Sequence, residues 1–282
     1  RRTLLASTNP VHSLSNLFQQ DVLGQPAVVC DERNCYAIEI DTKDTIDRSK
    51  REIREKMGWF LRFAGITSNA EDFVESAAIS PAFEESAMFE NMIDLMLKDE
   101  YDCYVFDTAP TAYTRRLLGM SKVFSLWLEK MLKSREEARS VRETLSYLEK
   151  KEADPLMDYL LDFKDRLAKA KVLLTDPEMT AFFLVLTTEE MVIKNTVKAA
   201  EFFAKFDVPL CGYIVNRVLP AELREQNIPE YLKNRLARQE HNLEVIGRQF
   251  QGQILALAPE MEHDVTGLLM IEKLARTMFS DL

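Results

Sequence analysis

The fold is decided by the stretch YVFDTAPTAYTRRLL, residues 104–118, in which a short apolar strand ends at Asp107 and a polar turn follows. A carboxylate directly after a buried strand is well placed to bind a magnesium ion or its waters. A cap on the next helix is the alternative, because Asp and Thr are both good N-caps. A cap needs one such residue, whereas this turn holds Asp107, Thr108, Pro110 and Thr111. The whole string therefore favours the magnesium interpretation.

Short apolar runs of strand length recur along the chain, separated by longer stretches with helical spacing. This alternation is typical of βαβ units and predicts an α/β fold, with a mostly parallel β-sheet flanked by helices. The runs are almost continuously apolar, as expected for strands that are covered on both faces. The predicted strands are Thr3–Ser7, Tyr36–Ile40, Cys103–Phe106, Phe182–Leu186, Leu210–Val215 and Ile254–Leu257.

Residues 117–171 are strongly charged and helical in pattern, and we expect them to form a helical insertion subdomain. Asp154 and Pro155 divide this segment into two helices, since proline is favoured in the first turn of a helix. Residues 1–116 and 172–282 then make up the α/β core.

Two other predicted strands also end in polar turns. The first strand is followed by Asn9, Pro10 and His12, and the strand that begins at Leu210 is followed by Asn216. The amide of Asn216 can donate and accept one hydrogen bond each, as the edge of adenine requires. An asparagine that satisfies its own turn is the alternative. Because ligands bind at the carboxyl ends of parallel strands, we expect these turns and Asp107 to lie at a ligand-binding edge of the sheet.

Composition excludes several classes of protein. The formal net charge of −10 and the pI near 5.0 argue against a nucleic-acid binder, which usually has a basic face. No apolar run is long enough to span a membrane. The four cysteines show no spacing typical of a metal site, and we expect reduced thiols in a cytoplasmic protein, with Cys103 and Cys211 in the core.

These segments together resemble the ArsA-type ATPases, which include arsenite-pump ATPases and the ATPases that target tail-anchored membrane proteins. The stretch VFDTAPTAYTRRLL is similar to their switch II, and LLASTNPVHSLSNLF, residues 4–18, is similar to their switch I. YAIEIDTKDTI resembles the segment after switch I, IVNRVLP the adenine-contact strand end, and APEMEHDVTGLLMI the late loop beside the base. The resemblance covers almost the whole chain in the family's order.

The resemblance implies a P-loop NTPase fold that works as a homodimer with ATP and Mg²⁺. Asn9 occupies the position of the switch I Asp that orients the attacking water, and Pro10 and His12 belong to the same switch. Asp107 corresponds to the switch II Asp near magnesium, usually acting through water. The remaining implied contacts are with the terminal phosphate, from Thr108, Pro110 and Thr111, and with the adenine, from Asn216 and Pro259.

The chain departs from the family in several respects. It has no glycine-rich phosphate loop, so we expect it to begin after that loop and after the central strand that precedes it. Asn9 is neutral and cannot act as a carboxylate base, which predicts slow or absent hydrolysis with nucleotide still bound. Ala112 and Tyr113 replace the usual Gly-His of switch II, and the cysteine spacing predicts neither a zinc clamp nor an arsenite site.

Two functions from different classes stay open. The first is an ATPase whose nucleotide-driven dimer closure is coupled to a hydrophobic client or a membrane transporter. The second is a non-hydrolysing nucleotide-binding scaffold or regulatory subunit, for which Asn9 would explain the lost hydrolysis. The methionines Met120, Met131 and Met157 would line a client groove in the first case, although packing of the insertion's helices against each other is the alternative.

Overall fold

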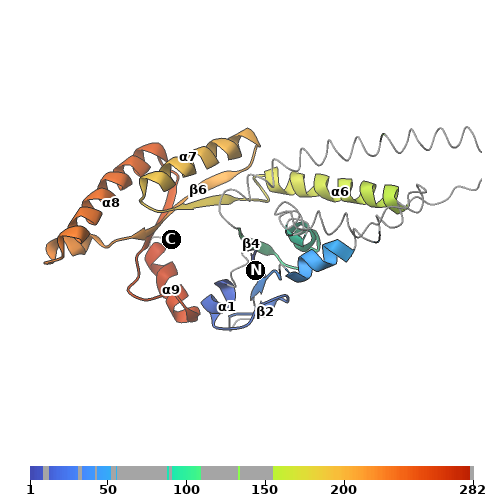
Figure 1. The fold of residues 1–282 in the computed structure, drawn as a ribbon, viewed down its shortest axis with the longest axis horizontal. Helices are drawn as coiled ribbons and strands as arrows, with labels where there is room; N and C mark the ends of the chain where they lie inside the picture. Colours follow the sequence, from blue (N-terminus) through green and yellow to red (C-terminus); the bar gives the residue numbers. More distant parts are fainter. Residues whose placement is uncertain are drawn as a thin grey trace, which may run out of the picture. The chain divides into compact units, whose positions relative to one another are not determined.

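The computed structural model describes residues 1–8, 13–30, 34–41, 43–51, 55, 88, 91–108, 133 and 155–279. The chain forms two compact units (Figure 1), which are considered separately below. The first unit consists of Arg1–Leu14 and Val22–Val172, and the second of Ser15–Asp21 and Leu173–Leu282. Five of the predicted site residues lie outside the described residues, namely Asn9, Pro10, His12, Pro110 and Thr111.

The first unit is built on a sheet with the strand order β2-β3-β1-β4. Strand β1 (Thr3–Ser7) pairs in parallel with β3 (Cys35–Glu39) on one side and with β4 (Cys103–Asp107) on the other. The short strand β2 (Ala27–Val28) pairs antiparallel with β3, and sequence analysis did not predict it. The short helix α1 (Ser13–Phe18) follows β1 along the chain.

One face of this sheet forms an aliphatic and aromatic core. Leu4, Ala6 and Ile38 are buried on it, because alternate residues of a strand point to the same face. Aromatic rings pack against them, with Tyr36 and Tyr101 edge to face at 5.1 Å between ring centroids. The opposite face therefore carries the other set of alternate residues, which includes the last residue of each parallel strand.

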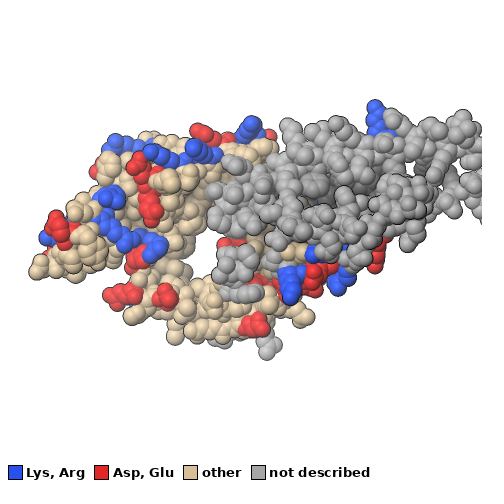
Figure 2. All heavy atoms as spheres, in the orientation of Figure 1, with Lys and Arg blue, Asp and Glu red and all other residues tan. Residues whose placement is uncertain are grey.

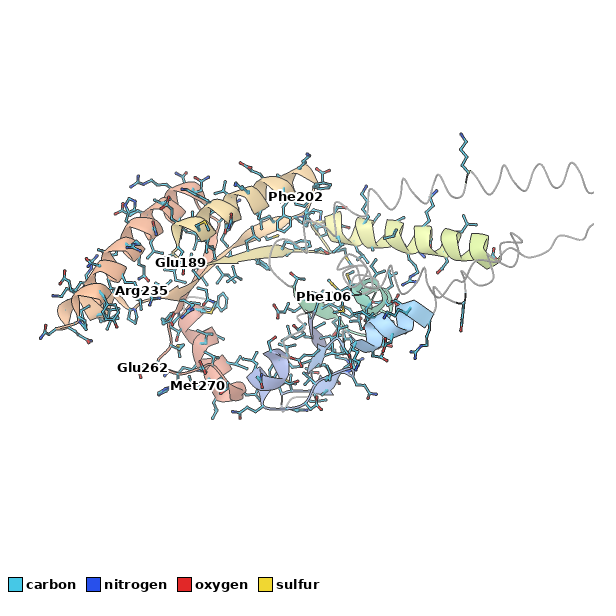
Figure 3. The ribbon with its side chains drawn as sticks, in the orientation of Figure 1. Phe106, Glu189, Phe202, Arg235, Glu262 and Met270 are labelled. Carbon is cyan, nitrogen blue, oxygen red and sulfur yellow. The ribbon has the colours of Figure 1, made fainter. Side chains whose placement is uncertain are left out.

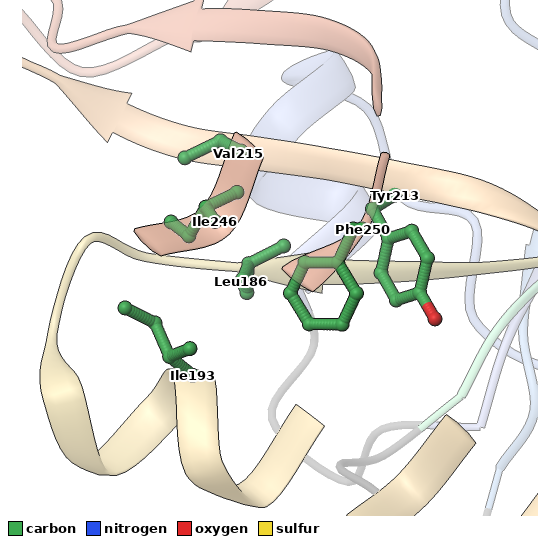
Figure 4. Packing of buried hydrophobic residues seen from close by; sticks show 6 residues of the cluster. All are labelled: Leu186, Ile193, Tyr213, Val215, Ile246 and Phe250. Atoms are coloured by element: carbon green, nitrogen blue, oxygen red, sulfur yellow. The ribbon is translucent and has the colours of Figure 1, made fainter. Parts of the chain in front are cut away.

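The second unit contains three parallel strands in the order β5-β6-β7, which are β5 (Phe182–Leu186), β6 (Leu210–Val218) and β7 (Ile254–Pro259). One face of this sheet packs against α7 (Glu190–Lys205) and α8 (Glu230–Gln249) through a cluster of buried side chains (Figure 4). Tyr213 and Phe250 stack within it at 4.1 Å between ring centroids. The structure also describes the 3-10 helix η1 (Ala221–Glu225) and the helix α9 (Gly267–Met278) in this unit. Helix α6 (Pro155–Thr175) belongs mostly to the first unit, in which residues 43–51 and 91–97 are helical as well.

Glycine is required in the middle of β6. A Cβ atom on Gly212 would lie 2.7 Å from Cγ of Leu255 and 2.9 Å from the carbonyl oxygen of Gln253, both on or next to β7. Contacts this close do not occur in folded proteins, so a side chain at this position would push β6 and β7 apart. The missing side chain of Gly212 thus permits the parallel pairing that carries Asn216 at the far end of β6.

The six predicted strands are confirmed, with shifts at their ends. Strand β6 continues to Val218, so the prediction that Asn216 follows the end of its strand is wrong, and Asn216 lies within β6. The prediction of a buried Cys211 is also wrong, because its side chain is exposed on β6. Helix α6 begins at Pro155 as predicted. The boundaries of the predicted insertion subdomain, residues 117–171, remain a prediction.

On each sheet, the face opposite the buried cluster is more exposed to solvent than the continuous apolar runs predict. Val105 of β4 and Val185 of β5 are 46% and 60% exposed, and Leu255 and Leu257 of β7 are exposed by nearly half. In the second unit, α7 and α8 both pack on the opposite face through the buried cluster. The expectation of strands covered on both faces is therefore wrong for these side chains.

Charged side chains are interspersed on the surface of the second unit. On the face shown in Figure 2, Lys and Arg alternate with Asp and Glu over α7 and α8. Pairs one helical turn apart account for part of this alternation, as with Lys194–Glu190 and Arg248–Glu244. Among the helices that the structure describes, none has the length and apolar character needed to cross a membrane.

We predict that Ile193→Ala destabilises the protein by about 2–5 kcal/mol, because it removes a side chain that is 5% exposed in the cluster of Figure 4. Met191→Ala, two residues earlier in α7, is the matched control. Met191 is 75% exposed, so its truncation should change stability by less than about 0.5 kcal/mol. Urea unfolding followed by far-ultraviolet circular dichroism measures both variants. Equal effects would contradict the described packing of α7.

Candidate functional site

Three polar side chains end the parallel strands of the first unit at the same level. Ser7 is paired in register with Glu39 on one side and with Asp107 on the other. Because in-register residues of parallel strands point to the same face, the three side chains lie on one face of the sheet. Ser7 and Glu39 are buried, whereas Asp107 is exposed. We call Ser7, Glu39 and Asp107 the strand-end row.

Hydrogen bonds fix Asp107 to the end of β1. The hydroxyl of Ser7 donates to Oδ2 of Asp107 at 3.1 Å. The backbone N–H of Thr8 donates to the carbonyl oxygen of Asp107 at 3.0 Å, and the Thr8 hydroxyl donates to the same oxygen at 3.3 Å. The two polar turns that sequence analysis predicted as switch segments therefore start from one hydrogen-bonded point. Thr108, the next predicted site residue, directly follows this point.

Glu39 is a candidate that sequence analysis did not identify as a site residue. Its side chain is 1% exposed, and Oε1 accepts a hydrogen bond of 2.5 Å from the backbone N–H of Leu14. Leu14 lies in the first turn of α1, where unpaired N–H groups and the helix dipole favour a negative charge. Glu39 thus anchors the helix that follows the predicted switch I to the strand-end row. An acidic residue inside an apolar run was the available signal.

In the second unit, Asn216 lies at a bulge near the end of β6. Strand β6 pairs with β7 at Val215–Leu257 and next at Val218–Pro259, so β6 contains one more residue than β7 between these positions. Asn216 and Arg217, which we call the β6 bulge, accommodate the difference. Arg217 has a φ of 59°, a left-handed conformation that costs a residue with a side chain about 1–2 kcal/mol.

The β6 bulge orients the amide of Asn216. The backbone N–H of Arg217 donates to Oδ1 of Asn216 at 2.9 Å, so the oxygen of the amide faces its own backbone. Asn216 is exposed, and its amide still has the capacity to donate two hydrogen bonds and accept another. Part of the turn alternative is therefore confirmed, because this asparagine does accept a hydrogen bond from its own bulge.

An ion pair connects the β6 bulge to the segment after β7. Arg217 binds Glu260 with both ends of its guanidinium group, with Nε to Oε2 at 2.8 Å and Nη2 to Oε1 at 2.9 Å. The backbone N–H of Glu260 also donates to the carbonyl oxygen of Val218 at 2.9 Å. Pro259 is thereby held beside Val218, so Asn216 and Pro259, both predicted to contact adenine, lie on adjacent strands that are tied together at this end.

Electrostatics reinforce this pair. The hydrogen bond to Glu260 and its negative charge raise the pKa of Arg217, and the charge of Glu189 adds to the effect. The hydrogen bond from Arg217 lowers the pKa of Glu260, a direction that burial opposes and that the charges of Arg217 and Arg235 favour. Glu189 and Arg235 are labelled in Figure 3. Both members of the pair are therefore charged at neutral pH.

Two buried amides of α8 anchor the ends of β5 and β6. Gln239 accepts a hydrogen bond from the backbone N–H of Leu219 at 2.8 Å and donates to the Leu219 carbonyl oxygen at 3.0 Å. Asn242 donates to the carbonyl oxygen of Thr188 at 2.7 Å. The segments that follow the carboxyl ends of these strands are thus held by side chains of α8. The buried hydroxyl of Thr187, next to this anchor, has no protein partner in the described part of the chain.

The donor set at Asp107 fits a magnesium ion. Mg²⁺ commonly retains several waters and is bound by one or two carboxylates together with phosphate oxygens. Asp107 supplies an exposed carboxylate whose orientation is fixed by Ser7. Within the described residues, no group of three or more His, Cys, Asp or Glu is arranged to bind a metal by itself. The oriented amide of Asn216 likewise fits the edge of an adenine.

Comparisons with known proteins identify the family of this chain. The family model for anion-transporting ATPases matches residues 1–280. The chain is 28% identical to a putative arsenical pump-driving ATPase of Halobacterium salinarum, over 98% of this chain and 39% of that protein. It is 27% identical to ATPase GET3A of Arabidopsis thaliana, over 94% of this chain and 72% of the relative.

A Paramecium tetraurelia protein, ATPase ASNA1 homolog 2, is also 27% identical, over 78% of this chain and 67% of its own length. The chain thus spans between about two-fifths and three-quarters of the length of these relatives. The match to the family model over nearly all of the sequence, together with relatives named as ATPases, shows that the chain belongs to the ArsA-type family of anion-transporting ATPases.

Proposed function

We propose that this chain binds ATP with Mg²⁺ and hydrolyses it, using Asp107 for the magnesium and phosphate chemistry and Asn216 for the base. The observation that carries the proposal is the fixed position of Asp107, which the Ser7 hydroxyl and both donors of Thr8 hold at the end of a parallel strand. Membership of a family of ATPases supports the same activity.

The strand-end row suggests a division of tasks. The hydroxyl of Ser7 orients the Asp107 carboxylate, which would accept hydrogen bonds from magnesium-bound water. When Mg²⁺ is bound, it would neutralise negative charge on the phosphate oxygens. Glu39 fixes the start of α1, the helix that follows the predicted switch I segment along the chain. Thr108, Pro110 and Thr111 would contact the terminal phosphate.

The partners that we propose follow from the relatives. The Halobacterium relative is named as an arsenical pump-driving ATPase. We propose that the present protein forms a cytoplasmic homodimer whose closure on ATP is coupled to a hydrophobic client or a membrane transporter. Leu161 and Val172 of α6 are at least half exposed and would be available to such a partner. Sedimentation velocity with and without ATP tests the dimer, and a monomer in both conditions would contradict it.

We predict that Asp107→Asn in the full-length protein lowers Mg²⁺-dependent ATP hydrolysis by about 10–100-fold, because a neutral amide orients magnesium-bound water poorly. Asp102→Asn is the matched control. Asp102 precedes the same strand at its other end, where its carboxylate accepts a hydrogen bond from the backbone N–H of Arg2. Steady-state hydrolysis assays compare the two variants. A loss of the same size in both would argue against a role for Asp107 in the chemistry.

The neutral side chain of Asn9 favours the second candidate function, a non-hydrolysing scaffold. A substitution at this position therefore distinguishes the scaffold from the ATPase. We predict that Asn9→Asp raises single-turnover hydrolysis by the full-length protein about tenfold or more, because a carboxylate can orient or deprotonate water. Asn16→Asp adds the same charge to an exposed position of α1 and should leave the rate unchanged. An unchanged rate for Asn9→Asp, with ATP binding intact, would refute the explanation of slow hydrolysis.

A further inference from the structure

The ends of β6 and β7 have a feature that contact with a base does not by itself require. Arg217 adopts a left-handed backbone conformation, yet it carries a long side chain where glycine would be less strained. That side chain makes a two-point ion pair with Glu260, the residue directly after the end of β7 at Pro259. Two parallel N–H to oxygen bonds fix the orientation of a guanidinium group as well as its distance.

We propose that Arg217 and Glu260 are positioning residues for base selection: their ion pair holds the β6 bulge in the conformation that orients the Asn216 amide toward adenine. This inference rests on the proposed function, in which Asn216 contacts the base.

The orientation of the amide is what distinguishes the two purines. In the bulge, the Arg217 N–H occupies one acceptor position of Asn216 Oδ1, which places the amide nitrogen at the other end of the side chain. Adenine offers an N6 donor beside the N7 acceptor, whereas guanine offers acceptors at both O6 and N7. An amide held in one orientation can match adenine with both its oxygen and its nitrogen. With guanine, the amide oxygen would face O6, which is an unfavourable contact.

The ion pair acts on this orientation through the backbone. Glu260 is joined to Val218 by its own N–H, so the pair and this hydrogen bond enclose the bulge from the β7 side. The side chain of Arg217 is 61% exposed and that of Glu260 is 29% exposed. Solvent-exposed ion pairs contribute little to global stability. Loss of the pair should therefore change the local geometry of Asn216 much more than it changes unfolding.

The test compares binding of ATP, GTP and inorganic tripolyphosphate to the full-length protein and its variants. Asn216→Ala tests the base contact itself. Glu260→Gln removes one charge of the pair, and Arg217→Gly removes the other while permitting the positive φ. Glu272→Gln is the matched control, because it breaks an exposed ion pair with Arg276 on α9. Circular dichroism and the melting temperature verify that each variant is folded.

We expect Glu260→Gln and Arg217→Gly each to lower the preference for ATP over GTP by about three- to tenfold, a part of what one two-point base contact provides. Tripolyphosphate has no base, so its affinity should not change in either variant. The charge-exchanged double variant R217E/E260R should recover most of the preference. Glu272→Gln should match the unmodified protein.

The outcomes separate this inference from the function on which it rests. If Asn216→Ala leaves the ATP preference intact, the proposed base contact is wrong and the positioning role falls with it. If Asn216→Ala abolishes the preference while Glu260→Gln and Arg217→Gly retain it, the base contact stands and the positioning role is refuted. A parallel loss of tripolyphosphate affinity in the pair variants would also refute it, because it would show a general disturbance of the site.

Discussion

The in-register parallel pairing of β1 with both β3 and β4 is the constraint on which the rest of the account depends. Because the three strands run in the same direction and end together, Ser7, Glu39 and Asp107 form one row on one face. A shift of one residue in either pairing would send Glu39 or Asp107 to the opposite face, among Tyr36 and Phe106. The aromatic core on that face therefore helps to fix which side chains lie on the opposite face of the sheet.

The second unit also has parallel strands that end at one edge, with one local exception. Its parallel strands also direct their carboxyl ends to one edge, and α8 holds two of those ends with the buried amides of Gln239 and Asn242. The exception is the β6 bulge, where an extra residue and a positive φ replace regular pairing. Strained backbone of this kind is concentrated at functional sites, where the surrounding structure maintains it.

The sequence was sufficient for features that depend on local pattern. The apolar runs predicted all six main strands, and Pro155 marked the start of α6. Asp107 was predicted to follow a strand, and it is the last residue of β4. It was insufficient where the structure depends on register between distant strands. Glu39 became a candidate only when its pairing with Ser7 and its bond to Leu14 were known. The Arg217–Glu260 pair joins residues 43 positions apart, and no local pattern indicates it.

We propose that these strand ends bind the nucleotide. A crystal structure of the full-length protein with Mg²⁺ and a non-hydrolysable ATP analogue tests it most directly. We expect a magnesium-bound water within hydrogen-bond distance of Asp107 and the adenine edge within hydrogen-bond distance of Asn216. A nucleotide bound without the contact to Asp107, or without the contact to Asn216, would contradict this mode of binding.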